Sequence, residues 1–178
     1  VHEGFGPEVS VYPSGGTPLF LSVAPRLITT LMRSLYLAMP VIFVIIAFAF
    51  RSIRLGLLSV LPNLLPITVG LGLLGLTGIS LRFSTLIAFP VAFGLAVDDT
   101  IHFLARYRSE MARGRSCGQA VTETMRSSGR AMVLTTVFLI VGHGVLMASN
   151  FLGLVHMAAL ICVILATALF GDIFVLPS

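Results

Sequence analysis

Long apolar runs separated by short polar segments dominate this chain. From Leu27 onward, five apolar stretches each reach the roughly 17 to 25 residues that an α-helix needs to cross a lipid bilayer. The pattern therefore predicts an all-α fold, a polytopic membrane helix bundle with five transmembrane helices. Their expected limits are residues 27–50, 55–78, 83–105, 129–149 and 154–176.

Two segments stand apart from these apolar stretches. Residues 1–26 contain four Pro, four Gly and two Glu and show no helical period. They are predicted to be the end of an extracytoplasmic domain, followed by a transmembrane domain over residues 27–178. Residues 116–128 are polar and compatible with a helix, which either lies on the membrane surface or serves as a plain linker.

The second apolar stretch is unusual in its prolines and glycines. Pro62 and Pro66 flank Asn63, and four glycines follow before residue 79. Small residues let helices approach closely, and a proline in a buried helix needs neighbours that satisfy the freed carbonyl groups. This span is therefore expected to pack inside the bundle.

Composition narrows the class of protein. The chain is 57% hydrophobic and 10% charged, with a mean hydropathy of +1.04, so a soluble domain is not expected. The net charge of +4 comes from eleven Arg, without any Lys, against seven acids. These Arg gather between apolar runs, which indicates loops facing anionic headgroups rather than a nucleic-acid surface.

The arginines also predict an orientation. Eight of them lie within residues 51–54 and 106–130, and three lie at residues 26, 33 and 82. Because cytoplasmic loops of membrane proteins carry the excess of basic residues, residues 51–54 and 106–130 are expected in the cytoplasm. Residues 1–26 are then external.

Asp98 and Asp99 are adjacent acids within the third apolar stretch. A rise of 1.5 Å per residue places them on the order of 10 Å inside the membrane. An ionised Asp near the centre of a membrane helix costs roughly 2.5 to 3.5 kcal/mol, so the pair needs a protein interior, a partner or a proton. Either the pair exchanges protons, or it holds a structural hydrogen bond or salt bridge to another helix.

Other polar residues accompany this pair. His102 lies one helical turn away and is either a relay member or a headgroup contact. Thr135 and Thr136 of the fourth stretch reach a similar depth if the helices pack, although a Thr in a span usually bonds to its own backbone. Asp172 lies near the carboxyl end of the last stretch and is expected to meet water.

Three segments carry a resemblance to a known superfamily. They are "RSIRLGLLSVLPNLLPITVGLGLLGLTGISL", "GLAVDDTIHFLARYR" and "SSGRAMVLTTVFLIVGHGVLMASNF". Together they resemble the carboxy-terminal membrane half of a resistance-nodulation-division (RND) transporter, and most of all the MMPL-like exporters of hydrophobic lipids and hopanoids. The most specific piece is G-x-x-V-D-[DY]-x-I-H-F-x-x-R-Y-R, where many MMPL members have Tyr in place of Asp99.

The resemblance implies a twelve-helix transporter of two six-helix repeats, of which this chain would hold the last five helices. It implies export of hydrophobic or lipid-like molecules across the bacterial inner membrane, driven by the proton motive force. Asp98 and Asp99 match the proton-exchanging acids, and Thr135 and Thr136 match the polar position on the next helix, with His102 beside them as a further relay candidate.

The partners implied are protons, membrane lipids, a lipid or hydrophobic cargo and the first repeat of the same protein, with a homo-oligomer left open. No nucleic acid, cofactor or metal is expected. A second reading is a membrane lipid sensor or binding module of the sterol-sensing type, without transport. A third, an intramembrane enzyme with a metal on Asp or His side chains, is disfavoured because no H-E-x-x-H motif is present.

Overall fold

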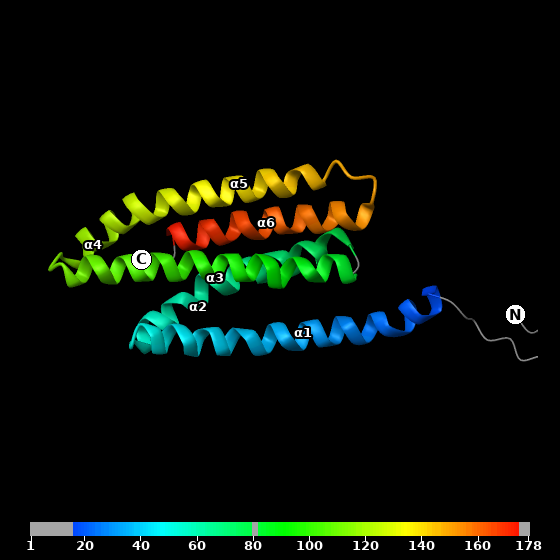
Figure 1. The fold of residues 1–178 in the computed structure, drawn as a ribbon, viewed down its shortest axis with the longest axis horizontal. Coiled ribbons are helices and arrows are strands. Elements are labelled where there is room, and N and C mark those ends of the chain that lie inside the picture. Colours follow the sequence, from blue (N-terminus) through cyan, green and yellow to red (C-terminus); the bar gives the residue numbers. More distant parts are fainter. Residues whose placement is uncertain (1–15, 80–81, 175–178) are drawn as a thin grey trace, which may run out of the picture.

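A computed structural model describes residues 16–79 and 82–174, which form helices joined by short turns. Five helical segments are long and apolar enough to cross a membrane, as the sequence predicts. The fold class is therefore confirmed as a polytopic helix bundle (Figure 1). The helices are α1 (Gly16–Ala49), α2 (Ile53–Thr77), α3 (Phe83–Ala112), α4 (Cys117–Thr124), α5 (Arg130–Leu146) and α6 (Leu152–Phe174), with a π-helical turn η1 (Met125–Gly129) between α4 and α5.

Helix α6 is the centre of the bundle. It packs against α2, α3 and α5, whereas α1 lies along the far side of α2 and α3 (Figure 1). The buried core accordingly contains Leu160, Ile161 and Ile164 of α6 together with Phe89 of α3. The outward faces keep large apolar side chains exposed, as expected for helices that contact lipid.

Helix α2 packs inside the bundle along one face, as predicted. Its buried residues include Pro62, Asn63, Pro66 and Gly70, while Leu57 and other apolar residues on the opposite side are exposed. A Cβ added at Gly70 would lie 2.9 Å from Ile164 Cγ1. Only glycine therefore allows α6 to approach α2 this closely.

Two segment boundaries differ from the apolar pattern. Helix α1 begins at Gly16, well before Leu27, and Pro18 is tolerated in its first turn because the N–H groups there have no intrahelical partner. Residues 1–15 lie outside the described residues. The chain is helical without a break from Cys117 to Leu146, and α4 packs against α3. The segment 116–128 is therefore a helix that packs against α3 and continues into α5.

Charged residues tie the end of α3 to the start of α4. The fully buried Glu110 carboxylate lies 2.9 Å from Arg106, 3.1 Å from Arg113 and 2.8 Å from Arg115. Arg115 also lies 3.7 Å from Glu123. A buried carboxylate is stable only when it is paired in this way, so Glu110 organises the turn between the two helices.

Substitution of Gly70 by Ala should destabilise the protein by about 1 to 3 kcal/mol, because the new methyl group overpacks against Ile164 and Phe89. Gly72 has no atom within 4 Å of an added Cβ, so Gly72→Ala is the matched control. Thermal unfolding in detergent compares the two variants. An equal midpoint for both would show that the α2–α6 contact is not tight.

Replacing Glu110 by Gln should lower stability by about 1 to 3 kcal/mol, because its ion pairs with arginine become weaker hydrogen bonds. Glu123→Gln removes a carboxylate that is more exposed and makes only one longer contact, so it should have little effect. Limited proteolysis of the turn at residues 113–116, measured beside the unfolding midpoint, reports the local loosening. Equal protection in both variants would contradict the role given to Glu110.

Candidate functional site

A chain of buried polar side chains crosses from α2 through α3 to α6. The Asn63 amide donates to the Thr100 hydroxyl at 3.2 Å. The Thr100 hydroxyl in turn donates to Asp172 Oδ1 at 2.8 Å. Asp172 is 2% exposed, and Thr100 is fully buried. Buried polar groups require partners, so these contacts fix how the three helices pack against one another.

A close helix crossing brings Asp172 to this place. Gly171 precedes it, and a Cβ there would lie 3.3 Å from the carbonyl oxygen of Pro62. The missing side chain lets α6 approach α2 near its proline-containing turn, next to Asn63. The expectation that Asp172 meets water is therefore wrong, because α2 and α3 cover the carboxyl end of α6.

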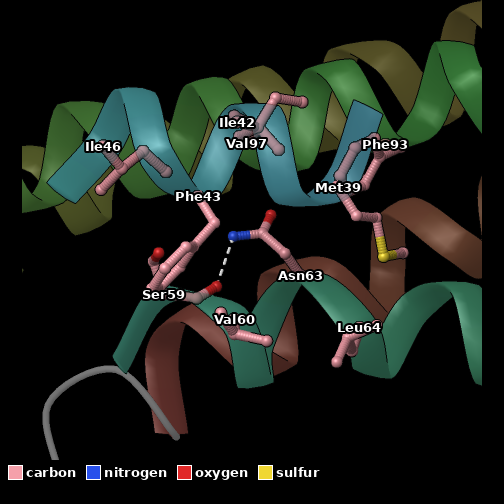
Figure 2. Close-up of a pocket in the computed structure, with 10 residues that line it drawn as sticks. All are labelled: Met39, Ile42, Phe43, Ile46, Ser59, Val60, Asn63, Leu64, Phe93 and Val97. Atoms are coloured by element: carbon pink, nitrogen blue, oxygen red, sulfur yellow. Dashed lines mark hydrogen bonds between the residues drawn. The ribbon is translucent and has the colours of Figure 1, made fainter. Parts of the chain in front are cut away.

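Asn63 also borders a small pocket between α1 and α2, of about 30 Å³. Figure 2 shows its amide nitrogen donating to Ser59, whose carbonyl oxygen is 2.7 Å away, while its oxygen is directed toward Ile42 and Val97. Among the described residues this oxygen is buried without a hydrogen-bond partner. The orientation of the Asn63 amide is thus set by its nitrogen, which donates hydrogen bonds to both Ser59 and Thr100.

A second, open polar site lies on the other side of α3. It is a groove between α3 and the η1–α5 segment, and its polar lining residues are Asp98, Asp99, His102, Arg106, Ser109, Ser128 and Thr135. The side chains of Asp98 and His102 are 67% and 72% exposed, and their Oδ1 and Nε2 atoms are 3.6 Å apart. Asp99 is half-buried between this groove and the bundle interior.

The structure brings together four of the five residues predicted from sequence. Asp98, Asp99, His102 and Thr135 share the groove, whereas Thr136 is 2% exposed and does not line it. The Thr135 hydroxyl donates to the carbonyls of Ala131 and Met132, at 3.1 and 3.0 Å, as is usual for Thr in a membrane helix.

Asn63, Thr100 and Asp172 form a site that the sequence pattern does not predict. They lie on three helices, so no spacing along the chain relates them. The available signal was the sequence of Gly171 and Asp172 inside an apolar stretch, since a glycine beside an acid permits a close crossing that buries the acid. Within the described residues, no three His, Cys, Asp or Glu side chains converge as metal ligands do.

Membrane-spanning helices with carboxyl groups and hydroxyls held between them define a polytopic membrane protein with an intramembrane polar site. More particularly, the chain belongs to the MMPL family, whose family model matches residues 7–178. The predicted likeness to the MMPL branch of the RND superfamily is thereby confirmed.

Similarity to individual proteins is low but extends over most of the chain. The probable transport protein MmpL11 of Mycobacterium leprae is 26% identical over 174 residues, which is 96% of this chain and 17% of that protein. The trehalose monomycolate exporter MmpL3 of Mycobacterium tuberculosis is 26% identical over 130 residues, or 71% of this chain and 14% of that protein. The chain thus spans a small part of the length of these relatives.

A solved structure supports the fold. The translocon-associated membrane protein SecDF of Thermus thermophilus superimposes with a TM-score of 0.79 at 22% identity, over 90% of this chain and 22% of that one. At this identity the likeness shows a shared helical architecture alone.

Replacing Thr100 by Val should destabilise the protein by about 1 to 3 kcal/mol, because it leaves Asp172 and the Asn63 amide without their shared hydroxyl. Thr100→Ser keeps that hydroxyl and should stay within about 1 kcal/mol of the wild type. Denaturant-induced loss of helix in micelles measures both. A serine variant as unstable as the valine variant would mean that the methyl group, and not the hydroxyl, matters.

Proposed function

We propose that this chain is part of a transporter that exports hydrophobic or lipid-like molecules and is driven by the proton motive force. The observation that carries the proposal is the pair Asp98 and Asp99 in the middle of a membrane-spanning helix, at a groove on the bundle surface. Membership in the MMPL family and the lipid export named for the MmpL3 relative support the cargo class.

The exposure of Asp98 supports a partner outside this chain. A carboxylate that is two-thirds exposed on an apolar helix would face lipid in an isolated bundle, at a cost of roughly 2.5 to 3.5 kcal/mol if ionised. His102, whose Nε2 atom lies 3.6 Å from Asp98 Oδ1, is itself mostly exposed. A covering helix, which we infer to come from the first repeat of the same protein, would remove both groups from lipid.

Three residues of the groove and Thr136 beside it would assist the carboxyl pair. His102 lies within reach of Asp98 and can share its proton, and Arg106 lines the end of the groove toward Glu110. Thr135 faces the carboxyl pair across the groove and can accept a hydrogen bond while its own hydrogen is held by the backbone. Thr136 would contribute from the buried side of α5.

The distribution of arginines and the family support a proposed orientation and location. We place the α1–α2 and α3–α5 connections in the cytoplasm, and residues 1–26 at the end of an extracytoplasmic domain. The proposed location is a bacterial inner membrane. Protons, membrane lipids and lipid cargo would be the partners.

Replacement of Asp98 or Asp99 by Asn should reduce gradient-driven export by at least about tenfold, equivalent to roughly 1.4 kcal/mol of barrier, because Asn cannot release or bind the coupled proton. The full-length protein in inverted vesicles, under an imposed proton gradient, is assayed with a fluorescent long-chain lipid and a pH-sensitive dye in the lumen.

Glu123→Gln, which changes a carboxylate outside the groove, is the matched control and should transport at the wild-type rate. Membrane amount and unfolding midpoint are measured for every variant. Undiminished export in both single variants and in the double variant would exclude a proton-coupled role for the pair. A lipid sensor or binding module without transport would then be the better description.

A further inference from the structure

Asp172 carries a carboxyl group that does not line the groove and has no role in the function proposed above. It lies on the opposite side of α3 from Asp98 and is 2% exposed, and within the described part of the chain its side-chain hydrogen bond comes from Thr100 alone. Among the described residues, no Arg or His lies within ion-pair distance of it. Its surroundings are thus apolar, apart from the Thr100 hydroxyl and the Asn63 amide behind it.

The hydrogen bonding suits a carboxylic acid that changes its protonation state. An ionised carboxylate can accept about four hydrogen bonds, and a buried one normally has several donors or a cation. Among residues 16–79 and 82–174, Asp172 has one side-chain donor, the Thr100 hydroxyl. A neutral acid needs only one acceptor for its O–H group, and Thr100 provides that as well. The site therefore has enough partners for the neutral form and only a minimum for the ionised form.

Three helices pack against α6, and each of them carries titratable residues. On α3, Asp99 precedes Thr100, whose hydroxyl contacts Asp172. On α2 the charged residue is Arg54, and on α5 the titratable residues are Arg130 and His143; none of these makes an ion pair with Asp172. Asp99 is thus the titratable residue next in sequence to the hydroxyl that contacts Asp172.

We propose that Asp172 is a further proton-binding site of the same path, which takes up the proton that Asp99 releases toward the bundle interior. This inference rests on the proposed function, because it extends the path from the groove to the centre of the bundle. Asp99 and Thr100 are neighbours on α3, so one carboxyl lies at the groove while the hydroxyl beside it contacts the buried carboxyl.

Thr100 can serve both states of Asp172 without moving. Its single hydroxyl hydrogen has two acceptors within reach, Asp172 Oδ1 at 2.8 Å and the Ala96 carbonyl at 3.1 Å. When Asp172 is ionised, the hydroxyl donates to it. When Asp172 gains a proton, its O–H donates to Thr100 Oγ1, and the Thr100 hydrogen turns to Ala96. The Asn63 amide occupies the second lone pair of Thr100 throughout.

The test is Asp172→Asn in the full-length protein, in the vesicle assay described above. Asn keeps an oxygen that accepts from Thr100, so a purely structural acceptor would be replaced without loss. We expect export driven by the proton gradient to fall at least about tenfold, which is roughly 1.4 kcal/mol, with an unfolding midpoint close to that of the wild type. Export at the wild-type rate, with the wild-type pH profile, would overturn the proposal.

Thr167→Val on the same helix is the matched control. The Thr167 hydroxyl donates only to carbonyls of its own helix, at 2.7 and 2.9 Å, so its removal should leave transport unchanged. Normal export in Asp172→Asn together with loss in Asp99→Asn would refute this inference alone. Normal export in Asp98→Asn and Asp99→Asn would refute the proposed function itself.

If Asp172→Asn fails to fold, a second measurement tests whether Asp172 binds and releases a proton in the wild-type protein. Dicyclohexylcarbodiimide reacts with protonated carboxyl groups in apolar surroundings, and mass spectrometry locates the adduct. In the wild-type protein we expect labelling of Asp172 at mildly acidic pH that decreases at mildly alkaline pH. Absence of labelling at both pH values, with Asp99 labelled as a positive control, would show that Asp172 does not exchange a proton.

Discussion

The close packing of α6 against α2 and α3 is the constraint on which the rest of this structure depends. Gly70 meets Ile164 at one crossing and Gly171 meets Pro62 at another, so a methyl group at either position would push the helices apart. Lipid tails are as apolar as the core side chains, so such bundles gain stability from close contact and internal hydrogen bonds. The hydrogen bond from Thr100 to Asp172 lies at a close contact between α3 and α6, so both contributions occur at the same point.

Two carboxyl environments lie on either side of α3, and one helix separates them. Asp98 is mostly exposed beside His102 in an open groove, whereas Asp172 is enclosed by α2 and α3 with a hydroxyl as its partner. Asp99 is half-buried, lines the groove and precedes Thr100, whose hydroxyl contacts Asp172. A helix that carries polar groups on two faces can connect an outer surface with an interior site.

The sequence predicts the five spans and the groove acids because both depend on local properties, namely run length and charge within a run. Asp98 and His102 share a face through helical spacing alone, so their contact could be foreseen. The burial of Asp172 could not be predicted from the sequence, because it depends on how α6 crosses α2 and α3. The hydrophobic period along each helix contains no information about that crossing. Helical spacing relates Glu110 to Arg106 and Arg113, whereas the contact with Arg115 across the turn and the burial of the carboxylate depend on how the chain folds back.

The π-helical turn at Met125–Gly129 adds a residue to one turn of a helix that otherwise runs unbroken from Cys117 to Leu146. One added residue rotates everything beyond it by about 100° around the helix axis. The face that α4 presents to α3 is therefore out of phase with the face that α5 presents to α6. In a relative with one residue fewer here, one half of the helix would have to turn a different set of side chains toward the groove.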